Sequence, residues 1–386
     1  MAKTDYLALC RAQDATDRLR VEACGFAGHD KALPPADRAT ALARRGETLV
    51  AQVKKRRGTF ELREMARADF EEARRLAPDD HDIQRLYIAF NSHWSSDTGD
   101  QIATINNLIA STGEDAGLLL QRGIAALRRG EHEKALADVQ RSIALDDKNS
   151  EAYRVAGLIL TTLLRNEESV AAYSAAIALA PDDAQLRFDR MGPALAAQQF
   201  TLAREDGDAV LDQKFPNAPF WEIRGAAKYM LRDYASAAGD FAHDFKIDRQ
   251  SVRLLVWKFL TEYRAGKADT ASASAKAREF GDQWPSAAFR FFAGEGKAAD
   301  VIAQAEAAVP ELRAARVSQA KFYVAEWGLM TGAPLDEVRR YFADVTAIGF
   351  KFGNVQSMAL DEPVMINEHC ILEMSLAVAR LKELTP

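Results

Sequence analysis

The sequence has 386 residues, of which 48% are hydrophobic and 27% are charged, and this is the composition of an ordinary folded protein. It excludes a largely disordered chain, which would contain far fewer apolar residues. The formal net charge of −6 gives no general attraction to nucleic acid or to an anionic membrane, although a local basic patch stays open. Abundant alanine with only twelve prolines favours helix.

Residues 1–35 form the first predicted element, a helical segment that either caps the chain's repeats or contacts a second copy. The opening MAKTDYLALC has no apolar stretch of a secretory signal, so we expect a cytoplasmic protein. Cys10 and Cys24 are either reduced thiols or one disulfide, and a disulfide would instead indicate a periplasmic protein whose leader has been removed.

An early repeat-like unit begins near Ala39. Gly46 and Pro78 are thirty-two residues apart in it, where later units have twenty-four, so eight extra residues lie near KKRRGTFELR. This insertion contains a basic cluster with two interpretations: a solvated turn, or a patch that binds nucleic acid or an acidic partner, with nucleic acid the less favoured function. The cluster consists of Lys54, Lys55, Arg56 and Arg57. In the degenerate unit that follows, Trp94 is either an exposed anchor or packs under its loop.

The chain repeats itself with a period of thirty-four residues. The tripeptide IAL at 143–145 recurs at 177–179, and APDD at 77–80 recurs at 180–183. Between these markers the apolar residues follow helical spacing in two bursts separated by a short polar turn, which predicts helix–turn–helix pairs. The two neighbouring aspartates that recur in the sequence then lie in the turns between one helix pair and the next, where they cap the following helix. We therefore do not interpret them as catalytic or metal-binding acids.

Small and aromatic residues recur inside these units. Gly157 and Gly225 lie in first helices, Tyr173 and Phe241 lie in second helices, and Pro193 lies within a predicted first helix. With Trp221 this pattern resembles the tetratricopeptide repeat, W-x2-L-G-x2-Y followed by A-x3-F and P. The resemblance implies an all-α fold, an α-solenoid in which about six repeats, some degenerate, form a right-handed superhelix across residues 36–283.

A solenoid of this family binds a segment of a partner protein in the groove lined by its first helices. The inward positions of each family unit are the second, fifth, ninth, twelfth and thirteenth. Transferred to this sequence, they predict a partner-binding groove that includes Leu120, Ile124, Arg128, Arg154, Leu158, Thr162, Phe188, Leu195, Glu222, Tyr229, Met230, Arg253, Val256, Leu260 and Tyr263.

Residues 284–386 change character. A WP-initiated half-repeat is followed by FYVAEWGLMTG, which predicts a first helix, and Val338, Phe342 and Val345 fit its partner helix. This part is similar to the C-terminal part of bacterial NlpI-like tetratricopeptide proteins. Residues 350–366 suggest a loop, and residues 369–384 a terminal capping helix.

Catalytic spacings are absent from the sequence. There is no phosphate-binding loop, zinc helix, CxxC pair or nucleophile elbow, and the six histidines have no ligand spacing. We therefore expect no enzyme, cofactor or metal. The favoured function is a protein-binding adaptor. A cell-envelope adaptor that positions envelope enzymes and a self-assembling scaffold, which includes a homo-oligomer, are alternatives.

Overall fold

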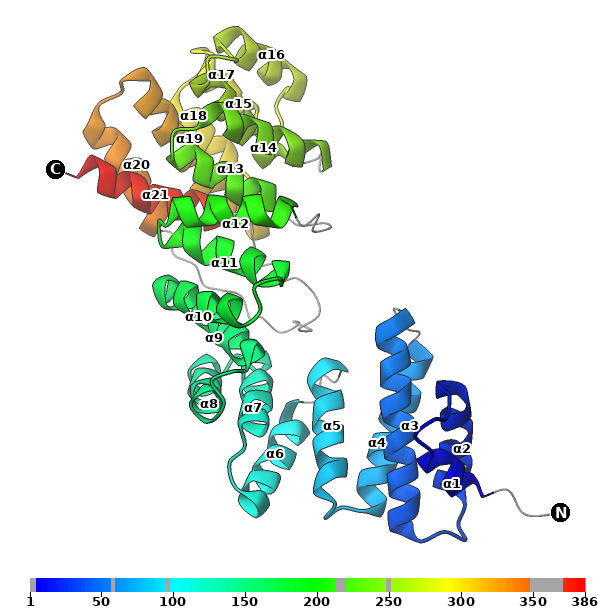
Figure 1. The fold of residues 1–386 in the computed structure, drawn as a ribbon. Helices are drawn as coiled ribbons and strands as arrows, with labels where there is room; N and C mark the ends of the chain where they lie inside the picture. The colour runs from blue at the N-terminus through cyan, green and yellow to red at the C-terminus, as the bar shows by residue number, and fades with distance from the viewer. Residues whose placement is uncertain are drawn as a thin grey trace. The chain divides into compact units, whose positions relative to one another are not determined.

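The computed structural model describes residues 5–56, 60–94, 98–212, 220–247, 251–347 and 371–385. These residues form helices and no strand, as predicted, and they divide into two compact units (Figure 1). Unit 1 lies within Met1–Lys148, and unit 2 lies within Asn149–Gly353 and Met365–Pro386. The sequence predicted three segments, 1–35, 36–283 and 284–386, from changes in the type of repeat. The two compact units are defined by contacts instead, so they do not test this division, which stays a prediction. None of the described helices is long and apolar enough to cross a membrane.

The helices of unit 1 are α1 (Tyr6–Arg11), α2 (Asp17–His29), α3 (Pro35–Arg56), α4 (Phe60–Leu76), α5 (His81–Trp94), α6 (Thr98–Thr112), α7 (Ala116–Arg128) and α8 (His132–Leu145). Those of unit 2 are α9 (Ser150–Thr162), α10 (Asn166–Leu179), α11 (Ala184–Ala196), α12 (Phe200–Asp212), α13 (Phe220–Met230), α14 (Tyr234–Ile247), α15 (Val252–Arg264), α16 (Thr270–Phe280), α17 (Ser286–Phe292), α18 (Ala298–Glu306), α19 (Pro310–Thr331), α20 (Leu335–Ala347) and α21 (Ile371–Leu384).

Consecutive helices pack as antiparallel pairs, and the described residues contain six such pairs from α3 to α14, in line with the roughly six units expected from the sequence. Capping residues begin many of the helices. Asp183 accepts a hydrogen bond from the backbone of Gln185 at 2.9 Å, as the aspartate-pair prediction requires. After the second aspartate pair the cap is instead Asn149, which accepts from Ala152. The eight extra residues lengthen α3 and α4, which have 22 and 17 residues.

Five of the described turns between helices have a residue in the left-handed region at the repeat period. These residues are Gly130, Leu164, Gln198, Arg232 and Gly266, with φ values of 75°, 59°, 62°, 65° and 69°. Glycine adopts this conformation without steric cost, and other residues adopt it at a cost of about 1–2 kcal/mol. The turn is therefore set by the packing of the two helices, because three of the five turns keep it without glycine.

Glycines in first helices allow the second helix to approach. A Cβ on Gly157 would lie 2.8 Å from the Tyr173 ring, and one on Gly225 would lie 3.2 Å from Phe241. This confirms the small-and-aromatic pattern. In unit 2 one large apolar cluster extends from Val170 to Ala379 and has Trp257, which is fully buried, among its members. Val338, Phe342 and Val345 are buried on α20, as predicted.

Candidate partner-binding face

The first helices of unit 2 lie next to one another, α9 beside α11 and α11 beside α13. In α9 and α13 the side that carries Gly157 and Gly225 packs against the second helix of the same pair. The opposite sides, at the five inward repeat positions, make up what we call the first-helix face. Its side chains are the predicted groove residues of unit 2.

The structure places the fifteen predicted groove residues in two environments. Ten are buried within the chain: Leu120, Ile124, Leu158, Leu195, Glu222, Tyr229, Met230, Arg253, Val256 and Leu260. Five are partly exposed: Arg128, Arg154, Thr162, Phe188 and Tyr263. Whether a partner touches any of them stays a prediction, but only the second group offers side-chain surface for a ligand without a rearrangement.

Part of the face is covered by α21, which contacts α11, α13, α19 and α20 (Figure 1). Trp257 on α15 donates through Nε1 to Glu373 Oε1 at 2.9 Å. Arg380 donates through Nε to Glu326 Oε1 on α19 at 2.7 Å, and the Tyr229 hydroxyl donates to the same carboxylate. The sequence predicted a capping helix here but gave no sign that it would cover predicted groove positions.

Further residues of the face lie on α9 and α11, and α21 contacts α11 as well. Arg154 makes two hydrogen bonds to Glu151, at 2.7 and 2.6 Å, and its guanidinium lies 3.9 Å from Asp189. Gln185 donates a hydrogen bond to Asp189 at 2.6 Å. Phe188, which precedes Asp189 in the chain, has a partly exposed side chain. We call these five residues, Glu151, Arg154, Gln185, Phe188 and Asp189, the α9–α11 patch.

Asp189 is the electrostatically unusual member of the patch. Burial raises the pKa of its carboxyl to about 6, against the opposing effects of the Gln185 hydrogen bond and the Arg154 charge. The charge of the patch therefore changes as the pH passes through about 6, since its most buried acid titrates there.

A second periodic feature was missed from the sequence. Arginines one position before the first-helix glycine site pair with aspartates on the second helix. Arg190 donates through Nε and Nη2 to Asp206 at 2.8 and 2.7 Å, and Arg224 does the same to Asp240 at 2.9 and 2.6 Å. A third nitrogen reaches the preceding pair of helices, where Arg190 Nη1 lies 2.7 Å from Ser174.

The same arrangement recurs in unit 1, where Arg122 contacts Asp138 and, through Nη1, Asn106. Each partner lies sixteen residues from its arginine in either direction. This fixed spacing is the sequence signal that could have revealed the pairs. They tie neighbouring helix pairs together, and their burial gives them a structural role.

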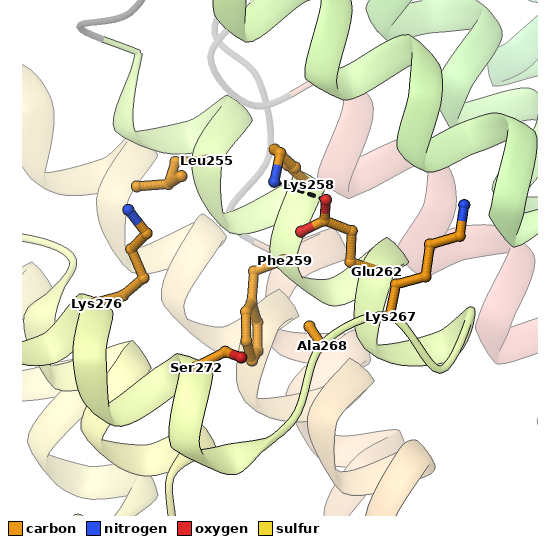
Figure 2. Close-up of a pocket in the computed structure, with 8 residues that line it drawn as sticks. All are labelled: Leu255, Lys258, Phe259, Glu262, Lys267, Ala268, Ser272 and Lys276. Atoms are coloured by element: carbon orange, nitrogen blue, oxygen red, sulfur yellow. Dashed lines mark ion pairs between the residues drawn. The ribbon is translucent and has the colours of Figure 1, made fainter.

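One cavity of about 110 Å³ lies beside α15 and α16, lined in part by three lysines, Lys258, Lys267 and Lys276 (Figure 2). Phe259 contributes apolar surface, and Lys258 pairs with Glu262 at 2.6 Å. The cavity contains none of the predicted groove residues. Its volume is below the roughly 300–1,000 Å³ of a small-molecule site.

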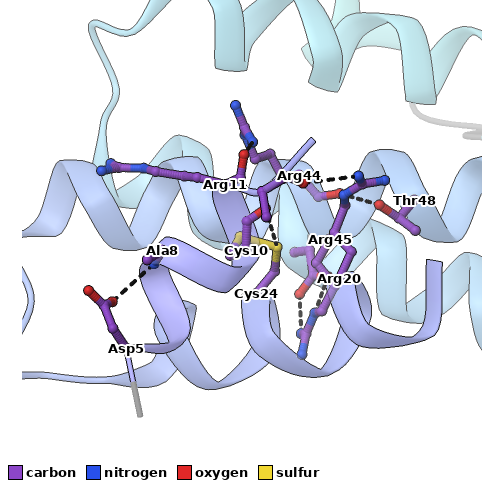
Figure 3. The surroundings of a disulfide bond; sticks show 11 residues. Asp5, Ala8, Cys10, Arg11, Arg20, Cys24, Arg44, Arg45 and Thr48 are labelled. Carbon is purple, nitrogen blue, oxygen red and sulfur yellow. Dashed lines mark hydrogen bonds and ion pairs between the residues drawn. A yellow bond between two sulfur atoms is a disulfide. The ribbon is translucent and has the colours of Figure 1, made fainter. Parts of the chain in front are cut away.

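The two N-terminal cysteines are bonded to each other in the structure. The Cys10–Cys24 disulfide joins α1 to α2, and both residues are fully buried (Figure 3). The side chains of the basic cluster Lys54–Arg57 and of Trp94 lie outside the described residues, as do residues 350–366. Among the residues that are described, no group of His, Cys, Asp or Glu is placed to hold a metal ion.

These features define an all-α protein built of tetratricopeptide-type helix pairs. No family model and no curated protein matches the chain. The fold is similar to pilF of Pseudomonas aeruginosa, with 13% identity, a TM-score of 0.47 and coverage of 59% of this chain and 97% of that one. A tetratricopeptide repeat protein of Parabacteroides merdae has 11% identity, a TM-score of 0.42 and coverage of 87% and 98%.

A third similar structure is a thermophilic tetratricopeptide repeat protein of Thermus thermophilus, with 18% identity, a TM-score of 0.39 and coverage of 49% and 98%. With TM-scores under 0.5 and identities under 20%, these similarities carry no conclusion about what this chain does. The resemblance of residues 284–386 to NlpI-like proteins is not confirmed by these matches.

Proposed function

We propose that the protein is a non-catalytic adaptor that binds a segment of another protein at the α9–α11 patch. One observation carries the proposal: adjacent first helices present a partly exposed arginine, Arg154, and a partly exposed aromatic ring, Phe188, at inward repeat positions. Arginine and aromatic side chains are the residues that most often dominate binding energy in protein interfaces. Helical repeats offer such faces to extended or helical segments.

The charge distribution of the patch indicates a partner with both polar and apolar groups. Glu151 and Gln185 orient Arg154 and Asp189, so the guanidinium and the carboxylate are held in place before a partner arrives. Side chains ordered in advance lose less entropy on binding. The apolar contact would come from Phe188.

The test is partner capture by the purified full chain from a native extract, followed by affinity measurement with the identified partner. The double variant Arg154→Ala with Phe188→Ala should weaken binding by about tenfold or more, as truncation of interface anchors does. Tyr229 is unsuitable for this purpose, since it is fully buried and its truncation would disturb the core.

The matched control is Arg165→Ala with Leu179→Ala, which removes a partly exposed arginine and an exposed apolar side chain from the region of α10. It should bind as the wild type does. Equal affinity of the wild type and the Arg154/Phe188 variant would show that the patch is not the binding site.

The disulfide favours the alternative of an adaptor in an oxidising compartment such as the cell envelope, because structural disulfides are rare in the cytosol. Protein isolated from its native host is alkylated before and after reduction. Protection of Cys10 and Cys24 until reduction supports this alternative, whereas alkylation of both without reduction eliminates it.

A further inference from the structure

The buried side of α21 has the form of a recognition helix. Glu373, Leu376 and Ala377 are fully buried and Arg380 is nearly so. These residues follow the i, i+3, i+4, i+7 spacing with which an amphipathic helix enters a groove on another protein. An acid and an arginine mark the two ends of this side.

Unit 2 has a matching receptor for each end. At one end, Glu373 accepts the Trp257 Nε1 hydrogen bond at 2.9 Å and lies 3.9 Å from Arg253. At the other end, Arg380 lies 2.7 Å from Glu326 and 5.5 Å from the centre of the Tyr229 ring. The receptor residues come from α13, α15 and α19.

The two ends are not equally well matched. The carboxylate of Glu326 is bound by Arg380, by Arg264 at 2.9 Å and by the Tyr229 hydroxyl. Glu373 is buried with its Oε2 atom lacking a hydrogen-bond partner among the described residues.

The arginine nearest to Glu373 is already engaged elsewhere. Arg253 Nη2 lies 2.6 Å from Glu222, and a second hydrogen bond joins Arg253 to the same carboxylate. Burial raises the pKa of Glu373 despite the nearby Arg253, and the Glu222 charge adds to the rise. A buried carboxylate oxygen with no side-chain donor among the described residues is costly, so α21 is an imperfect ligand of its own site.

In some proteins buried polar contacts of this kind determine which partner pairs rather than adding stability. We propose, building on the adaptor function above, that the surface of α13, α15 and α19 is a helix receptor of which α21 is the resident occupant. The partner is a helix of another protein that carries an acid or its amide and, seven residues later, an arginine. It takes the place of α21.

The experiment uses the full chain and a fluorescent peptide with the sequence of residues 371–384 as the probe. In Arg380→Ala, α21 loses its contact with Glu326, so the peptide should bind at least about tenfold more tightly than it binds the wild type, as expected when one member of a buried charged pair is removed. A peptide with alanine in place of its arginine should not bind. Glu383→Ala, which removes a more exposed partner of Arg380, is the matched control and should behave as the wild type.

A second variant acts in the opposite direction and keeps the test decisive if Arg380→Ala does not fold. In Glu373→Gln the amide oxygen still accepts from Trp257 and the neutral side chain removes the cost of burying a charge there, so α21 should be held more tightly. Amide hydrogen exchange of α21 should slow, and binding of the peptide should fall below the wild-type level. Faster exchange of α21 in this variant would contradict the proposal.

Three outcomes separate this inference from the adaptor proposal. Peptide binding to Arg380→Ala, with increased partner capture, supports the receptor. A folded Arg380→Ala chain that binds no peptide makes α21 a permanent part of the core and overturns the receptor, while the effect of Arg154/Phe188 truncation still decides the adaptor function. Dimers of the Arg380→Ala chain without peptide, seen by native mass spectrometry, would identify a second copy as the occupant and overturn the proposed partner.

Discussion

Asp189 shows how one buried carboxyl couples the binding face to pH. Its pKa in the folded chain is about 6, mainly because of burial, while an unfolded aspartate titrates at about 3.9. The folded state therefore holds the proton more tightly. The stabilising contribution is complete below the unfolded value and is lost as the pH rises through about 6.

We predict that Asp189→Asn removes this pH dependence. The amide oxygen that replaces the carboxylate can still accept from Gln185, so the variant should match the wild type near pH 4 and exceed its stability by roughly 2 kcal/mol at pH 7.5. Urea unfolding across this pH range measures the difference. Asp182→Asn, in an exposed turn, controls for the loss of one charge. A stability difference that does not change with pH would contradict the account.

Between helices, the arginine–aspartate pairs hold α7, α11 and α13 to their own second helices, and a third nitrogen of each arginine reaches the preceding pair. Arg190 and Asp206 have side chains only 10% and 2% exposed, so either residue left alone would be a buried charge. Ala156 occupies the corresponding position in α9 and has no such pair, and α9 still packs on α10 through Gly157 and Tyr173. The pairs therefore reinforce the helix packing rather than create it.

Arg190→Ala should reduce the free energy of unfolding by about 3 kcal/mol, the lower end for a broken buried pair. The lower end is appropriate because Arg187 lies 4.0 Å from Asp206 and partly compensates the charge. Arg190→Met with Asp206→Leu should lose much less, since no charge is stranded. Arg165→Ala breaks an exposed pair with Glu168 and should change the stability by no more than about 1 kcal/mol. Equal losses for the single and double variants would refute this explanation.

Across the whole molecule, each helix pair contacts mainly its sequence neighbours, so a local defect should spread only a short way. A Cβ on Gly46 would lie 2.7 Å from the Phe70 ring in unit 1. Overpacking of this kind costs about 1–3 kcal/mol.

We predict that Gly46→Ala accelerates amide hydrogen exchange in α3 to α6 and leaves α19 to α21 unchanged. Gly239→Ala on α14, whose Cβ would meet nothing within 4 Å, is the control and should slow local exchange or leave it unaltered. If Gly46→Ala raised exchange throughout the described helices, the two units would unfold together and the prediction would be wrong.

The helix pairs were predictable from the sequence because their determinants are local. Gly157 and Tyr173, or Gly225 and Phe241, are sixteen residues apart and meet within one pair of helices. The capping role of Asp183 also depends on its immediate neighbours. The arginine–aspartate pairs have an equally local spacing, but they were not predicted from the sequence. Such contacts recur with the thirty-four-residue period, which is why the fold class follows from the sequence without a matching family.

The accessible part of the candidate site could not be read in this way. Repeat positions predicted Tyr229 and Phe188 alike as groove residues, but Tyr229 is buried against Glu326, which lies 97 residues further along the chain. Trp257 and Glu373 are 116 residues apart. A repeat pattern specifies which side of a helix faces inward, whereas the segment that covers that side is selected by long-range packing and charge pairing that leave no periodic trace. The sequence alone therefore determined the helix pairs, and only the tertiary structure decided that α21 packs against the first-helix face while Arg154 and Phe188 stay partly exposed.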